Sequence, residues 1–197
     1  MKNSFSFSLI VLTIILYSCA NPNKGLNSNS KEAQKARIDT LYNDSIQGMF
    51  FGIPFGANQE IVIKKLREQG FAFSQYNSTE TLLRFKPLNH SAFSFGNMEW
   101  VFLDIGLDNK RFNYIRFMSI NDDKASAVHN FNNVLTSVSE KYQMTEGTPR
   151  DSTEYKLYVG YSKTSRMLWI SCFKYESKVY VSLEYDDIEF KKVSSEL

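Results

Sequence analysis

Apolar residues follow the three- and four-residue spacing of an amphipathic helix in two parts of the chain. In the first part, Val62 and Leu66 share one helix face. Asn58 is a suitable N-cap residue, and Gly70 is a natural C-terminal stop. This pattern predicts a helix over residues 58–70.

The second part gives the clearer helical pattern. Asn121 or Asp122 can act as its N-cap. Its apolar stripe then comprises Val128, Phe131, Leu135, Val138 and Tyr142. The spacing predicts a longer amphipathic helix that ends near residue 142.

The remaining apolar runs alternate with polar residues, which is typical of β-strands. Alternation begins at Phe71 and Phe73, after the first helix. Further strands are expected at Thr81–Phe85, Ala92–Phe95, Glu99–Leu107, Phe112–Ile120, Glu154–Ser162, Arg166–Tyr175 and Lys178–Asp186. Short turn segments separate several of them, so we expect antiparallel hairpins.

A helix followed by strands therefore occurs twice along the chain. We predict one globular α+β unit with two layers, in which helices cover one face of an antiparallel sheet. Its halves are residues 47–120 and 121–197, each a helix-then-strands module. The sequences of the two halves barely match, so the repeat is one of architecture.

The first half opens with the pattern GxPFGxxxExVxxxL, from Gly52 to Leu66. With this opening, residues 50–187 resemble small bacterial lipoproteins built on helix-plus-antiparallel-sheet modules. The nearest named likeness is the β-lactamase inhibitory protein fold, a tandem of such modules, and the outer-membrane assembly lipoprotein BamE is more distantly similar. The resemblance implies a non-catalytic binding protein.

The amino-terminal segment has the composition of an export signal. Lys2 is followed by an apolar run from Phe5 to Tyr17, which is shorter than the ~20 residues that span a bilayer. The sequence Leu-Tyr-Ser-Cys that ends at Cys19 resembles the bacterial lipobox, with Tyr17 as its departure from the usual small residue. The resemblance implies cleavage after residue 18 and lipidation of Cys19. An ordinary signal peptide cleaved near Ala20 is the open alternative.

Residues 19–46 are rich in Asn, Ser and Lys, and they predict a flexible tether behind the anchor. Ala20 stands where an aspartate would oppose transfer to the outer membrane under the familiar sorting rule. We therefore expect a lipid-anchored protein of the cell envelope at the outer membrane, facing the periplasm. Its first partner would be the membrane itself, through the lipid.

The net charge of the chain bears on whether nucleic acid could be its partner. The formal net charge is +2, and it falls to +1 without residues 1–18, whose only charged residue is Lys2. A nearly neutral chain lacks the excess of basic residues that is typical of nucleic-acid-binding proteins.

The two cysteines raise the question of a disulfide. If Cys19 carries lipid, Cys172 has no disulfide partner. Its apolar neighbours predict a buried thiol without a catalytic role.

Catalytic signatures are weak throughout the sequence. His90 and His129 lack metal-ligand spacing, and no phosphate loop or nucleophile elbow occurs. The acidic cluster Glu184, Asp186, Asp187 and Glu189 is expected to be a solvated strand end. We expect no cofactor, no metal and no catalytic residues. An envelope hydrolase that acts on glycan or peptide with a carboxylate pair stays open as the alternative function.

Strand alternation also predicts a face rich in aromatic residues, opposite the aliphatic positions. Tyrosine, tryptophan and arginine are enriched at binding hot spots, so this face is a candidate surface for a protein or another envelope component. Strand propensity alone, or coverage by the other half of the domain, would explain the same pattern. The candidate binding residues are Trp100, Phe102, Tyr114, Arg116, Tyr158 and Tyr180.

Overall fold

The computed structural model describes residues 42–89, 93–163 and 166–188. The predicted signal peptide, Cys19 and nearly all of the predicted tether lie outside these residues. The described residues belong to one compact unit. Within them, none of the helices has the length and apolar character required to cross a membrane.

Strands dominate the described part of this unit, where two α-helices and one short 3-10 helix accompany them. The strands of the first half are β1 (Tyr42–Asn43), β2 (Met49–Phe50), β3 (Ile53–Pro54), β4 (Phe71–Phe73), β5 (Leu82–Pro87), β6 (Ser94–Phe95), β7 (Met98–Glu99), β8 (Phe102–Asp108) and β9 (Arg111–Asn121). The later strands are β10 (Thr145–Glu146), β11 (Glu154–Ser162), β12 (Arg166–Tyr175) and β13 (Lys178–Asp187). The helices are α3 (Gln59–Glu68), the 3-10 turn η1 (Gln75–Asn77) and α4 (Lys124–Ser139).

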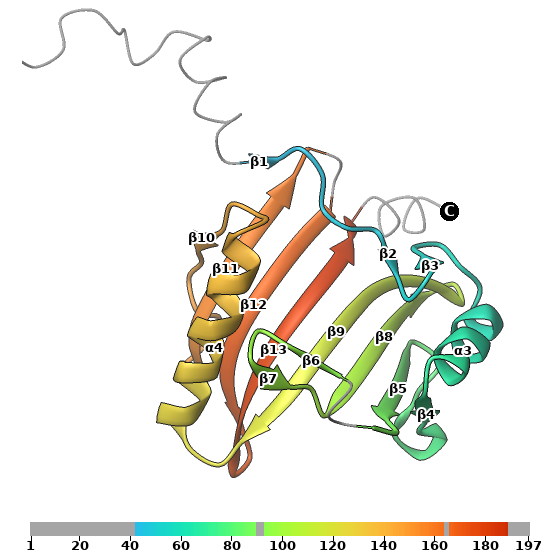
Figure 1. Ribbon diagram of the computed structural model, residues 1–197, viewed down its shortest axis with the longest axis horizontal. Helices are drawn as coiled ribbons and strands as arrows, with labels where there is room; N and C mark the ends of the chain where they lie inside the picture. The colour runs from blue at the N-terminus through green and yellow to red at the C-terminus, as the bar shows by residue number, and fades with distance from the viewer. Residues whose placement is uncertain (1–41, 90–92, 164–165, 189–197) are drawn as a thin grey trace, which may run out of the picture. The chain divides into compact units, whose positions relative to one another are not determined.

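One large sheet contains nine of these strands, in the order β1-β11-β12-β13-β9-β8-β5-β4, with β10 also paired to β11 (Figure 1). All its pairs are antiparallel except β1 with β11. The α+β class and the antiparallel hairpins predicted from the sequence are therefore confirmed. Two small hairpins, β2–β3 and β6–β7, lie outside the large sheet.

Helix α3 forms as its sequence predicts. The Asn58 side chain accepts a hydrogen bond from the Glu60 backbone N–H at 2.9 Å, which satisfies a donor of the first turn. The chain leaves the helix through Gly70, whose φ of +85° suits glycine. Val62 and Leu66 are fully buried, and the helix packs against β4 and β9.

Helix α4 begins later than predicted, because its N-cap is Asp123 rather than Asn121 or Asp122. The Asp123 carboxylate accepts from the Ser126 backbone N–H at 2.9 Å. Asn121 still belongs to β9, where its side chain donates toward the Val179 carbonyl. The buried residues of α4 are Ala127, Phe131, Val134 and Val138, whereas the predicted stripe residues Val128 and Leu135 are only partly buried. The helix packs across β9, β12 and β13.

A single core cluster joins both α-helices to the sheet. Leu103, Ile115 and Leu183 carry it across the central strands β8, β9 and β13. The predicted alternation is thus correct for these residues, but it is interrupted where the β8–β9 pairing shifts register between Gly106 and Leu107. Trp100, Phe85, Phe112 and Phe131 are the largest side chains that are fully buried.

The predicted tether extends too far along the chain. Tyr42 and Asn43 form β1 and pair in parallel with Tyr161 and Ser162 of β11. Ile46 is only 1% exposed and belongs to the core. The compact unit therefore begins before residue 47. The sequence did not show this, because Ile46 follows a mostly polar stretch and is not part of a periodic apolar pattern.

Candidate functional site

Side chains of the central strands that point away from the core form a second surface, which we call the outer face. Strand pairing fixes its members, because directly paired residues point to the same side of a sheet. Asp104 is the Cα partner of both Arg84 and Arg116, and Arg116 pairs in turn with Glu184. The outer face comprises Arg84, Lys86, Phe102, Asp104, Tyr114, Arg116, Trp169, Phe173, Tyr180 and Glu184.

Four of the six predicted binding residues lie on the outer face. Phe102, Tyr114, Arg116 and Tyr180 are all half-buried there, so each still presents part of its surface. Sequence reasoning missed Trp169 and Phe173, although the same alternation along β12 would have placed them on this face.

The prediction for Trp100 is wrong. Strand β8 begins at Phe102, so the alternation of that strand does not extend back to residue 100. Trp100 is 1% exposed and turns into the core, where its ring lies 5.9 Å from the ring of Phe117. Trp100 is therefore a core residue and not part of an outer binding surface.

The prediction for Tyr158 is also wrong. Tyr158 does point opposite to Leu157 and Val159, but Tyr158 is on the core side and the two aliphatic residues are on the other side, where the segment at Gly147 lies against them. Tyr158 pairs with Ile170 and packs against the Phe131 ring of α4 at 5.9 Å. Leu157 takes the opposite side of the strand and is nevertheless buried.

An ion pair holds the β5–β8 end of the outer face. Arg84 donates from Nε and Nη2 to the two carboxylate oxygens of Asp104, both at 2.7 Å. The hydrogen bond to Asp104 is the main cause that raises the pKa of Arg84. The Arg84 guanidinium lies 5.1 Å from the centre of the Phe102 ring, and the Lys86 ammonium lies 5.2 Å from it. Two cations thus surround one half-buried aromatic ring.

A second group of charged and aromatic residues lies at the centre of the outer face. Arg116 forms an ion pair with Glu184 and lies 5.4 Å from the centre of the Tyr114 ring. Burial raises the pKa of Tyr114 to about 12, so its phenol stays neutral at physiological pH. Tyr180 stacks on Phe173 with ring centres 5.6 Å apart.

A hollow of about 320 Å³ lies beside this group. Arg150 reaches over Trp169, with 5.9 Å between its guanidinium carbon and the ring centre, and forms an ion pair with the buried Glu154. Ser171 and Ser182 share a hydrogen bond of 2.8 Å within the hollow. Glu184 and Asp186 also line it, so it combines aromatic, hydroxyl, acidic and basic groups.

The described residues bring together no arrangement with an evident catalytic role. Within residues 42–89, 93–163 and 166–188, no group of three or more His, Cys, Asp and Glu side chains could hold a metal ion. His129 is exposed on α4 and interacts with Asn133. Glu184 and Asp187 form ion pairs with arginines, which places them in a structured network rather than at a solvated strand end. His90 and Glu189 lie outside the described residues.

Cys172 is fully buried in the core, as predicted. Burial raises the pKa of its thiol to about 11, whereas an unfolded cysteine titrates near 8.5. In a Cys19→Ser background, we expect iodoacetamide at pH 8 to label the folded protein at least roughly a hundredfold more slowly than the urea-unfolded chain.

Replacing Cys172 with alanine removes a small buried side chain. Cys172→Ala should therefore lower the free energy of unfolding by about 1 kcal/mol. Rapid labelling of the folded protein would contradict both expectations.

Comparison with known proteins gives no relative from which an activity could be transferred. No family model, curated protein or solved structure matches this chain. The geometry of the described residues is therefore the basis for any functional assignment.

Proposed function

We propose that the chain is a membrane-anchored lipoprotein of the cell envelope and acts as a non-catalytic binding module through its outer face. The observation that carries this proposal is the array of half-buried aromatic rings and ion-paired arginines on one side of the sheet. Its partner would be a protein or another envelope component.

The arginines of this face support binding because they are already held in place. Arg84 and Arg116 are fixed by carboxylates and packed over aromatic rings. A partner would therefore lose less side-chain entropy when it immobilises them. Planar guanidinium groups beside aromatic rings are typical of residues that dominate interface energies.

We also infer a two-layer arrangement, in which the helices cover one face of the sheet and leave the outer face for a partner. Support comes from the order of elements. Helix α3 precedes β4, β5, β8 and β9, and α4 precedes β11, β12 and β13. Residues 47–120 and 121–197 would be the two helix-then-strands halves, which meet where β9 pairs with β13.

The proposed anchor is a diacylglyceryl group on Cys19, and Ala20 favours the outer membrane facing the periplasm. Mass spectrometry of the mature amino terminus is expected to find an acylated Cys19 as the first residue. Cys19→Ser should abolish the modification and leave an uncleaved or mis-sorted chain. An unmodified mature terminus at Ala20 or beyond would show that the protein is exported without this anchor.

Site-specific photo-crosslinking in cells tests the binding surface. A photoreactive residue in place of Phe102 or Tyr180 is expected to give a discrete crosslinked species. The same residue in place of Tyr76, which is 97% exposed and is not one of the outer-face residues, should not give it. Once the partner is identified, Tyr180→Ala should weaken its binding by about 1–2 kcal/mol with little change in melting temperature. Equal crosslinking at all three positions, or none at any, would argue against an interface here.

The alternative of an envelope hydrolase has one observation in its favour. Glu184 and Asp186 line the same hollow as Trp169, and an aromatic ring beside carboxylates would suit a sugar. The pairing of Glu184 with Arg116 fits a structural role better than proton transfer, so we place binding first.

A further inference from the structure

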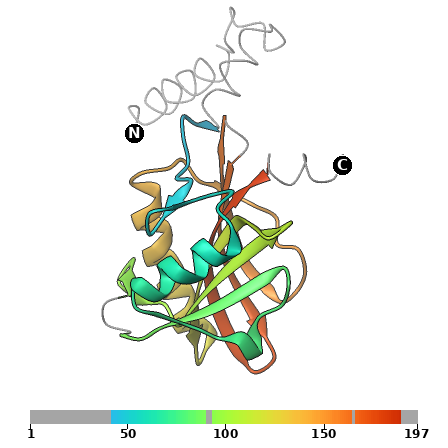
Figure 2. The same cartoon turned by 90° about the vertical axis from the view of Figure 1, so that its right-hand side faces the viewer.

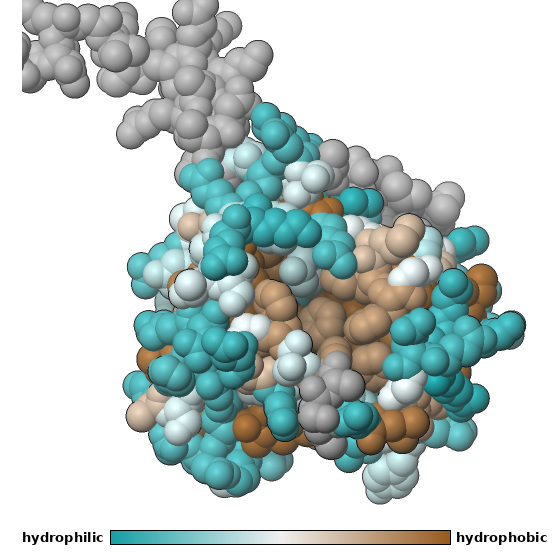
Figure 3. Space-filling model, viewed as in Figure 1, coloured by the Kyte–Doolittle hydropathy of each residue, from teal (hydrophilic) through white to brown (hydrophobic). Residues whose placement is uncertain are grey.

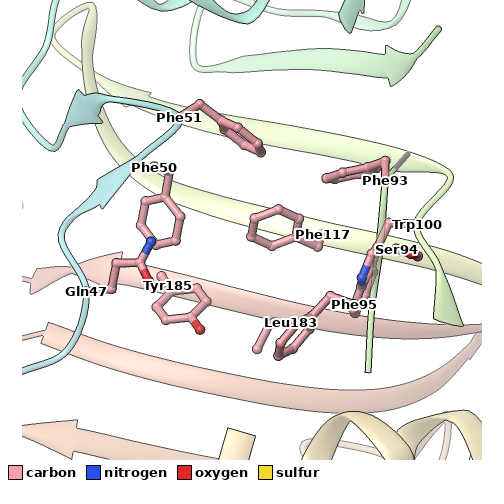
Figure 4. A pocket seen from close by; sticks show the side chains of 10 residues that line it. All are labelled: Gln47, Phe50, Phe51, Phe93, Ser94, Phe95, Trp100, Phe117, Leu183 and Tyr185. Carbon is pink, nitrogen blue, oxygen red and sulfur yellow. The ribbon is translucent and has the colours of Figure 1, made fainter. Parts of the chain in front are cut away.

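A separate pocket lies on the core side of the sheet, away from the outer face. Figure 3 shows it as a brown hollow in the middle of that side of the molecule. It has a volume of about 240 Å³. Figure 4 shows its lining side chains, which are Gln47, Phe50, Phe51, Phe93, Ser94, Phe95, Trp100, Phe117, Leu183 and Tyr185.

The lining of this pocket is aromatic and uncharged. Seven of the ten residues are phenylalanine, tryptophan or tyrosine, and none carries a formal charge. The rings meet at an angle rather than in stacks: Phe93 and Phe117 are 5.8 Å apart with their planes at 39°, and Phe51 and Phe93 are 6.4 Å apart at 49°. Such a lining favours apolar ligands and disfavours ionised groups, which would lose their hydration without a compensating charge.

One buried polar group in the lining lacks a hydrogen-bond partner. Trp100 is 1% exposed, and its Nε1–H finds no acceptor among the described residues. A buried donor without an acceptor costs about 1–3 kcal/mol, so the fold maintains this group at an energetic cost. Tyr185 adds a phenolic hydroxyl to the lining, which can donate or accept a hydrogen bond.

The backbone at Phe51 gives a third, independent indication. Phe51 has a φ of 53° and Gly52 a φ of 71°, in the two-residue turn between β2 and β3. Asparagine or aspartate usually occupies the first position of such a turn, because bulky side chains are strained there. Here the strained turn carries an aromatic ring that lines the pocket (Figure 4). Residues held in unfavourable backbone conformations concentrate at ligand sites.

We propose that this pocket binds the acyl chain of a small neutral amphiphile, whose ester or amide carbonyl accepts a hydrogen bond from Tyr185. A methylene group occupies about the same volume as a water molecule, ~30 Å³, so the pocket has room for roughly eight methylene groups. Tyr185 lies on the Gln47 side of the pocket and Trp100 on the Phe93 side (Figure 4), so the acyl chain would extend from Tyr185 toward Trp100.

An acyl chain fits this lining better than a peptide does. Every peptide residue brings a backbone N–H and a C=O group that need partners when they are buried. Among its described lining residues, the pocket offers one buried polar atom without a partner, Trp100 Nε1, which is too few for a run of peptide units. A free fatty acid is disfavoured as well, because none of the ten described lining residues is a cation that could pair with its carboxylate.

Displacement of the neutral fluorescent probe N-phenyl-1-naphthylamine from the full-length protein tests this proposal. Octanamide is expected to displace the probe with one-to-one stoichiometry, and octanoate at pH 8 should bind at least about tenfold more weakly. Tyr185→Phe should weaken octanamide about three- to tenfold, the loss of one hydrogen bond, and leave the probe's own affinity unchanged. Tyr158→Phe is the matched control, since Tyr158 is a core-side tyrosine outside the pocket.

Ser94→Trp provides a second variant that does not depend on the buried residues. Ser94 is exposed at the rim, so the new indole should obstruct the pocket without disturbing the fold, and octanamide binding should be lost. Four results would overturn the proposal. They are no octanamide binding to the wild type, equal effects of the two tyrosine variants, full binding to Ser94→Trp, and stronger displacement by N-acetylphenylalaninamide than by octanamide. The last result would point to a peptide ligand.

Discussion

Replacing Trp100 with alanine is expected to lower the free energy of unfolding by about 3–5 kcal/mol. The side chain is 1% exposed and packs against Phe117 in the core, so its removal opens a cavity that the neighbouring rings can fill only in part. For a domain of this size, the melting temperature should fall by roughly 6–20 °C. A thermal melt followed by circular dichroism measures the change.

Tyr76→Ala is the control for this experiment. Tyr76 is 97% exposed, so its truncation should change the free energy of unfolding by less than about 0.5 kcal/mol. A melting temperature for Trp100→Ala as high as that of the control would mean that Trp100 does not belong to the core. The expected large fall would confirm that Trp100 contributes to stability and not to the outer face.

Replacing Arg84 with methionine should cost about 3 kcal/mol of stability. Asp104 is completely buried, and both of its carboxylate oxygens accept hydrogen bonds from Arg84. Methionine retains most of the aliphatic stem but leaves this carboxylate without its charged partner. Breaking a buried pair in this way typically costs 3–5 kcal/mol, and we expect the lower end because the Arg84 side chain is 27% exposed. Urea unfolding at pH 7 gives the value.

A double variant separates the loss of the charged partner from a loss of packing. Arg84→Met with Asp104→Leu removes both charges, so it should recover most of the stability lost in Arg84→Met. Lys86→Met, on the same strand and the same face, is the matched single control and should be nearly neutral. A double variant no more stable than Arg84→Met would show that Asp104 is not the source of the cost.

The periodicity of the sequence predicted the α+β class and most elements because apolar spacing reflects burial directly. Val62 and Leu66 mark the buried face of α3, and Leu103 and Leu183 lie on the core side of their strands, as the alternation predicts. The two errors have different causes. Trp100 precedes its strand, so strand alternation does not apply to it. In β11 the alternation holds, but the aliphatic residues Leu157 and Val159 are buried on the side away from the core, which leaves Tyr158 on the core side.

The aromatic pocket could not be predicted from spacing. Its lining comes from the chain around Gln47, the β2–β3 turn, the β6–β7 hairpin and strands β9 and β13, which only the fold brings together. One feature of the sequence, at Phe50 and Phe51, could have pointed to the pocket. Two adjacent phenylalanines before a glycine are unusual in a tight turn, where asparagine is the common residue. The lipid anchor on Cys19 and the partner of the outer face remain predictions.

The two short strands beside β11 have a consequence for the solubility of this protein. β10 pairs with Tyr158 and Val159, and β1 pairs with Tyr161 and Ser162, so the outermost long strand is occupied by pieces of two residues each. An unpaired edge is a template for another chain, and very short edge strands offer little to pair with. The opposite edge, β4, has only three residues. If lipid anchors crowd many copies onto one membrane surface, both ends of the sheet are already shaped to discourage the growth of intermolecular sheets.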